Sequence, residues 1–81
     1  MQRRVTIGEY EVSIQADRSD DPHRPGYVVR YSIIRTDGRP VRGDLLQVQS
    51  YDLINGTDYF VSVDAALNYG EEKARQDVAA F

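Results

Sequence analysis

The fold is decided by the C-terminal stretch Ser62–Phe81, SVDAALNYGEEKARQDVAAF, the one segment with a long helical pattern. Apolar residues recur along it at steps of three and four, as they do on one face of a helix. Ser62 is a favourable N-cap, and Asp64 adds a negative charge near the positive end of the helix dipole. One amphipathic helix is therefore predicted, with an apolar stripe of Val63, Leu67, Gly70, Ala74, Val78 and Phe81.

Gly70 is an unusual residue for the middle of a buried helical stripe. A glycine inside a helix costs about 1 kcal/mol relative to alanine. Either the helix approaches the sheet so closely that a Cβ would not fit, or the helix breaks near Tyr69 and Gly70. The apolar periodicity continues across the glycine, which favours the close approach.

Length and composition indicate one small domain spanning residues 1–81. A chain of 81 residues has room for one thin hydrophobic core, and its 41% hydrophobic content is ordinary for a globular protein. It contains no cysteine, so disulfides and a thiol nucleophile are excluded. Neither a signal peptide nor a transmembrane stretch is evident, and a cytoplasmic location is the expectation.

Alternating apolar residues predict strands ahead of the helix. The alternation changes phase at Gly8-Glu9, which indicates a bulge or a turn there. Asp17–Pro25 is rich in aspartate and proline and is expected to be a polar loop. The predicted strands are Glu9–Ala16, Tyr27–Thr36, Asp44–Leu53 and, with a poorer pattern, Asp58–Val61.

Two turn signals set the expected strand register. Asp37-Gly38 is typical of a two-residue hairpin turn, and such a turn would place Val29 opposite Leu46. Asn55-Gly56 would begin a second hairpin. Together these patterns predict an α+β fold: an antiparallel three- to four-stranded β-meander with one C-terminal α-helix packed on one face.

The residues that could carry chemistry are few. His23 is the only histidine, and it lies in the polar loop without a serine or cysteine patterned near it. Asp17, Asp20 and Asp21 lack the spacing of a calcium-binding loop. The chain is therefore expected not to be an enzyme and to need no cofactor and no metal.

The candidate binding surface is the outer face of the sheet, opposite the helix. The predicted registers put Ile34 opposite Val41 and Tyr51 opposite Phe60 on that face, where nothing else in the chain would cover them. The candidate binding residues are Arg30, Ile34, Val41, Leu45, Tyr51 and Phe60. Their mixed apolar and polar character predicts a protein-interaction or self-association module.

A nucleic-acid-binding module that uses the open sheet face is the alternative. Charge argues against it, because residues 51–81 carry two basic and six acidic side chains and the whole chain has a net charge of −3. A protein partner or a second copy is therefore expected before nucleic acid, and no membrane partner is expected.

Two resemblances add to this interpretation. The strand order and the segment Glu71–Phe81 resemble the last part of a double-stranded RNA-binding domain. That family's first helix is absent here, and Glu71 and Glu72 replace its basic cluster, so RNA binding is not implied. The strand-rich first part with Val63–Gly70 and Ala74-Arg75 is similar to a group of short uncharacterised proteobacterial proteins of Burkholderia-type genomes. That resemblance implies a sheet with one C-terminal helix and no particular activity.

Overall fold

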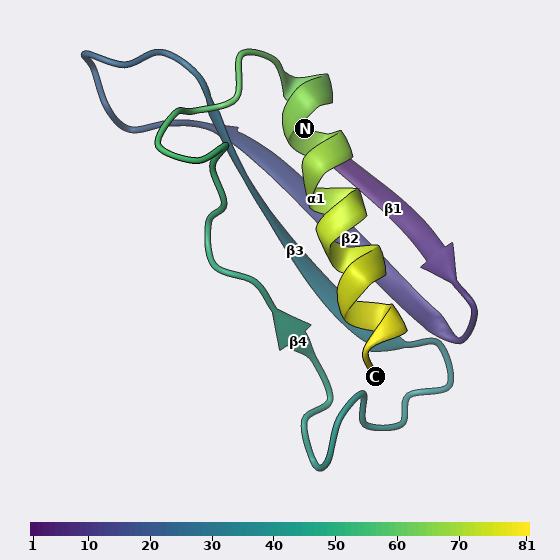
Figure 1. Cartoon of the computed structure of the whole chain (residues 1–81). Coiled ribbons are helices and arrows are strands. Elements are labelled where there is room, and N and C mark those ends of the chain that lie inside the picture. Colours follow the sequence, from purple (N-terminus) through teal and green to yellow (C-terminus); the bar gives the residue numbers. More distant parts are fainter.

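A single helix lies across one face of a four-stranded antiparallel sheet in the computed structural model, which describes all residues 1–81 (Figure 1). Neighbouring strands in the sequence are neighbours in the sheet, in the order β1-β2-β3-β4. The predicted α+β meander with one C-terminal helix is confirmed. The elements are β1 Gln2–Ile7, β2 Tyr10–Arg18, β3 Tyr27–Arg35, β4 Val48–Gln49 and α1 Val63–Ala79.

The first strand, β1, was not among the predicted strands. A two-residue turn at Gly8-Glu9 joins it to β2, and the register pairs Ile7 with Tyr10. Gly8 has a φ of 59°, a left-handed conformation that glycine adopts without steric cost. The phase change at Gly8-Glu9 is therefore a turn between two strands rather than a bulge within one.

The predicted two-residue hairpin at Asp37-Gly38 is wrong. The Gly38 N–H does donate to the Arg35 carbonyl at 3.3 Å, but the chain then leaves the sheet and returns only at Val48, opposite Ile33. The Asp37 carboxylate explains the departure, because it accepts the Arg39 N–H at 3.0 Å and binds the Arg35 guanidinium at 2.9 Å. These local bonds compete with a hairpin ladder for the same backbone group.

Residues 48–60, the return segment, run beside β3 but form little regular strand. Val29 lies opposite Leu53 rather than Leu46. Tyr31 and Val29 are two positions apart on β3, whereas their partners Ser50 and Leu53 are three apart, so the return segment bulges between them. The predicted strand Asp44–Leu53 therefore shrinks to β4 and isolated bridges at Leu45 and Leu53. Asp58–Val61 shrinks to two isolated bridges, one between Asp58 and Asn55 and one between Phe60 and Tyr27.

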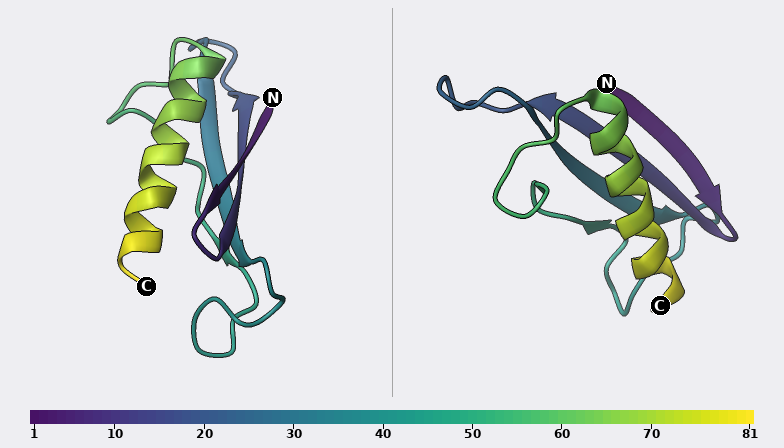
Figure 2. Two further views of the ribbon diagram at one scale, coloured as in Figure 1. Left: turned by 90° about the vertical axis from the view of Figure 1, so that its right-hand side faces the viewer. Right: turned by 45° about the horizontal axis from the view of Figure 1, so that its top comes forward.

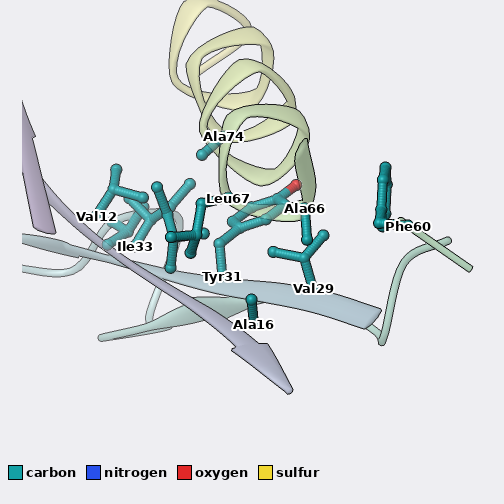
Figure 3. Close-up of a cluster of buried hydrophobic side chains, with 11 residues drawn as sticks. Val12, Ala16, Val29, Tyr31, Ile33, Phe60, Ala66, Leu67 and Ala74 are labelled. Atoms are coloured by element: carbon teal, nitrogen blue, oxygen red, sulfur yellow. The ribbon is translucent and has the colours of Figure 1, made fainter. Parts of the chain in front are cut away.

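The hydrophobic core fills the space between α1 and the central strands. Val12 and Ile14 of β2 and Val29 and Ile33 of β3 are the largest fully buried side chains. Figure 3 shows Ala66, Leu67 and Ala74 of α1 packed against these strand side chains, with Tyr31 beneath the helix. Small residues on the helix allow the two layers to lie close together.

Gly70 marks the closest approach of these two layers. A Cβ at this position would lie 2.7 Å from Val29 Cγ2 and 2.8 Å from Ile14 Cγ2, well inside normal contact distance. The helix continues without interruption from Val63 to Ala79. The close approach is confirmed, and the alternative of a broken helix is excluded.

The two ends of α1 are held differently. At the N-terminus, Ser62 Oγ accepts the Ala65 N–H at 3.1 Å, which confirms the predicted cap. The last turn has no basic residue and instead carries Asp77, which the helix dipole disfavours there. The buried Tyr31 hydroxyl donates a hydrogen bond to the Asp77 carboxylate and ties this end to β3. Burial first, and then the contact with Asp77, raise the pKa of Tyr31 well above its usual range.

Candidate functional site

The outer face of the sheet carries the side chains that alternate with the core residues. Ser13 of β2 lies directly opposite Ser32 of β3, and Gln15 lies opposite Arg30. Figure 2 shows the helix on the other side of the sheet only, so no second layer covers this face. The outer-face residues of the three long strands are Gln2, Arg4, Thr6, Glu11, Ser13, Gln15, Asp17, Val28, Arg30, Ser32 and Ile34.

Phe60 was predicted on this face and does not lie there. It exchanges two backbone hydrogen bonds with Tyr27, both at 2.9 Å, and Tyr27 is on the helix side of β3. Directly opposite residues share a face, so the Phe60 ring also turns toward the helix. It is only 6% exposed, and its centroid lies 5.0 Å from that of Tyr69.

Val41 is the second candidate residue that the structure places elsewhere. It is 8% exposed and belongs to the core cluster, in the loop that replaces the predicted hairpin. Its N–H donates to the Leu45 carbonyl at 2.8 Å, so it is not paired with β3. On the β4 side of β3 the ladder ends at Ile33, so the predicted Ile34–Val41 pair does not form, and the cross-strand neighbour of Ile34 is Glu11 on β2.

The remaining apolar candidates are exposed but scattered. Tyr51 is 90% exposed because it stands in the bulge of the return segment, and Leu45 lies in the tight turn after Arg42. Neither residue belongs to a strand. Of the six candidates, Arg30 and Ile34 are the two that lie in a strand on the sheet's outer face, and the predicted pairs Ile34–Val41 and Tyr51–Phe60 do not form.

A polar hollow occupies the centre of the outer face instead. Its volume is about 300 Å³, and it is open to solvent. Hydroxyls and side-chain amides dominate its lining, and each can both donate and accept hydrogen bonds. The residues that form it include Ser13, Gln15, Arg30, Ser32, Gln49 and Ser50.

The two arginines of this face are already paired with carboxylates. Arg30 lies between Asp17 at 3.3 Å and Asp52 at 3.6 Å. Arg4 lies 3.6 Å from Glu11. Such half-exposed pairs contribute little to stability, but they leave the face with alternating charges rather than a concentrated positive field.

The loop between β2 and β3 borders two further hollows, of about 580 and 540 Å³, that are open to solvent. Both are lined in part by Asp20 and Asp21, and Asp21 accepts the His23 N–H at 2.9 Å. No three histidine, cysteine or carboxylate side chains come together in a way that could hold a metal ion. α1 does not have the length and hydrophobicity that a membrane-spanning helix requires.

The open edge of β1 is a further feature of the surface, and no strand was predicted there from the sequence. The Met1 amine donates to the Ala16 carbonyl at 3.2 Å, and the Ala16 N–H donates back to Met1 at 2.9 Å. Hydrogen-bonded pairs alternate in an antiparallel ladder, so Arg3, Val5 and Ile7 also bond to β2. The N–H and C=O groups of Gln2, Arg4 and Thr6 therefore point away from the sheet. The alternating apolar residues Val5 and Ile7, just before Gly8-Glu9, were the sequence pattern that could have predicted this strand.

No family model matches this chain, and no curated protein or solved structure matches it either. Function is therefore inferred from the geometry and charge of the molecule's own surfaces.

Proposed function

We propose that this protein is a non-catalytic interaction module that binds another polypeptide through the uncovered side of its sheet. The observation that carries the proposal is the combination of an outer face without a second layer and an adjoining strand, β1, with an unpaired edge. An exposed strand edge is a template for a further strand. The polar hollow beside it supplies hydroxyl and amide groups for side-chain contacts.

The surface chemistry favours a polypeptide over nucleic acid. Binding to phosphates relies on basic side chains that are free to neutralise them, whereas Arg4 and Arg30 already face carboxylates. Stacking of bases on a sheet needs aromatic rings on its open face, and Phe60 is turned toward the helix. Of the two aromatic candidates, Tyr51 alone remains exposed, and together with the paired arginines this supports a polypeptide over nucleic acid.

The test is capture of proteins from the source cell's lysate by immobilised wild type and by surface variants. Gln49→Arg and Ile34→Glu place a new charge on the outer face, and Gln76→Arg places one on the solvent side of α1 as the matched control. We expect a polypeptide that wild type and the control retain and that both outer-face variants lose. Phe60→Glu is unsuitable, because it would place a charge in the core.

Two outcomes would overturn the proposal. One is a set of captured proteins that the outer-face variants leave unchanged. The other is tight, salt-sensitive binding of RNA or DNA in a gel-shift assay at low salt, which would restore the nucleic-acid alternative.

A further inference from the structure

The open edge of β1 is long and regular. Six consecutive residues pair with β2 in one unbroken register, and neither a proline nor a bulge interrupts them. Gln2, Arg4 and Thr6 each direct an N–H and a C=O away from the sheet, as derived above. Unpaired groups in this arrangement bond readily to an added antiparallel or parallel strand.

The opposite edge of the sheet does not offer such a template. It is formed by β4, which has two residues, and by the bulge and turns of the return segment. Each chain therefore presents one long edge. If that edge pairs with the same edge of another copy, the assembly closes at two chains, since a two-fold axis consumes both edges.

We propose that, besides the polypeptide bound on the outer face, a second copy of this chain binds at the β1 edge, and that β1 pairs antiparallel with β1 of that copy. The product is one continuous sheet with both helices on the same face. Identical edges are complementary in an antiparallel pairing, because a two-fold axis places each donor of one copy opposite an acceptor of the other.

Charge and the length of β1 select one register among those that bring the outward groups together. A two-fold axis at Arg4 would place Arg4 opposite Arg4, and an axis at Arg3 would place Arg3 opposite Arg3. Like charges directly opposite each other destabilise a strand pair. An axis at Val5 or at Thr6 avoids both clashes. The axis at Thr6 places Arg4 opposite Gly8, which lies in the turn after β1, whereas the axis at Val5 places Arg4 opposite the second copy's Thr6 and Arg3 opposite its Ile7, all within the strand. The axis at Val5 therefore pairs more of the outward backbone groups.

The contacts of the two arginines fit this register. Arg3 Nη1 donates to Asn68 Oδ1 at 2.8 Å and to Glu71 Oε1 at 3.2 Å, so its guanidinium is drawn toward α1. Arg4 keeps Glu11 as its counter-charge on the outer face. Half-buried Val5 and Ile7, which already pack against the core, would become covered by the second copy.

The first test is the molar mass of the purified chain by light scattering over a range of concentrations. Wild type is expected at twice its 9.2 kDa. Thr6→Pro removes an N–H that points away from β2, so it spares the β1–β2 ladder and deletes a donor at the dimer contact. We expect Thr6→Pro to raise the dimer dissociation constant at least tenfold, whereas Thr6→Val, which keeps the N–H, should remain dimeric.

Cysteine cross-linking tests the register, since the chain has no cysteine of its own. Val5 meets Val5 at a non-hydrogen-bonded pair, where Cα atoms of opposite strands lie about 4.5 Å apart, within the range for a disulfide. Val5→Cys should cross-link two chains under a mild oxidant. Ile7→Cys, which the register places opposite Arg3, should not.

A monomeric wild type at all concentrations, or a dimer that Thr6→Pro leaves intact while the fold is unchanged by circular dichroism, would overturn the inference. More efficient cross-linking through Ile7→Cys than through Val5→Cys would overturn the register. If wild type is monomeric but captures a protein from lysate that Gln49→Arg fails to capture, the self-pairing is wrong and the proposed interaction module still holds.

Discussion

Residues 2–35 and residues 36–61 contain similar turn signals but fold very differently. The first region supplies β1, β2 and β3, with continuous ladders between them. The second supplies a two-residue strand and a few isolated bridges. Gly8-Glu9 lies between residues that alternate toward one core, whereas Asp37 binds the neighbouring Arg35 side chain and Arg39 N–H. A turn dipeptide thus yields a hairpin only when its flanking residues pair across it.

The largest expected difference between the two regions concerns burial. Ile33→Ala, at a fully buried position on β3, should lower the free energy of unfolding by about 2–5 kcal/mol because it removes contacts and leaves a cavity. Leu46→Ala, at a position 62% exposed in the second region, should change it by less than about 0.5 kcal/mol. Equilibrium urea unfolding measures the free energy of unfolding of both variants. Equal losses would show that the loop before β4 is as tightly packed as the sheet.

Gly70 tests how closely the helix is held against the first region. Gly70→Leu should destabilise the protein by about 1–3 kcal/mol, since a side chain there overlaps Val29 and Ile14. Gly70→Ala should give no gain despite the better helix propensity of alanine, worth about 1 kcal/mol. Thermal and urea unfolding are the measurements. If Gly70→Ala raises the stability by that amount, the two layers are more loosely packed than the structure indicates.

Two tyrosines give a matched comparison of the regions at alkaline pH. Burial and the hydrogen bond to Asp77 raise the pKa of Tyr31. The native state therefore holds the hydroxyl proton of Tyr31 more tightly than the unfolded chain does, where the pKa of tyrosine is about 10. Stability from this group is complete below pH 10 and is lost as the pH rises above it. Tyr31→Phe should flatten the decline in urea midpoint above pH 10, whereas Tyr51→Phe, at the exposed bulge, should leave it unchanged.

The smallest expected effect is in acid, at the turn that diverts the chain from β3. Hydrogen bonds from Arg35 first, and then from the Arg39 N–H, hold the pKa of the Asp37 carboxyl well below its usual range. Its contribution to stability is present above about pH 4, the unfolded value, and is lost as the pH falls below it. Asp37→Asn should lose less stability than wild type between pH 4 and pH 2, and Asp44→Asn in the same loop serves as control. Identical acid profiles for Asp37→Asn and wild type would show that these bonds do not order the turn.

The candidate surface was predicted in outline and misplaced in detail. That a sheet with one covering helix leaves a face open followed from the apolar patterns alone. Which residues stand on that face depended on the register, and the assumed hairpin at Asp37-Gly38 shifted it. Val41 was therefore assigned to the outer face, and the assumed hairpin at Asn55-Gly56 assigned Phe60 there by pairing it with Tyr51. Both Val41 and Phe60 are buried, whereas Arg30 and Ile34 lie on a strand whose alternation was clear.

Local patterns in the sequence determined the helix, its Ser62 cap, the need for glycine at position 70 and the alternation of β2 and β3. Each depends on residues a few positions apart, whose spacing alone decides which side chains share a face. Only the tertiary structure decided where residues 36–61 return to the sheet. The bulge at Tyr51 and the pairing of Phe60 with Tyr27 involve partners distant in the sequence, and a shift of one residue moves every later side chain to the opposite face.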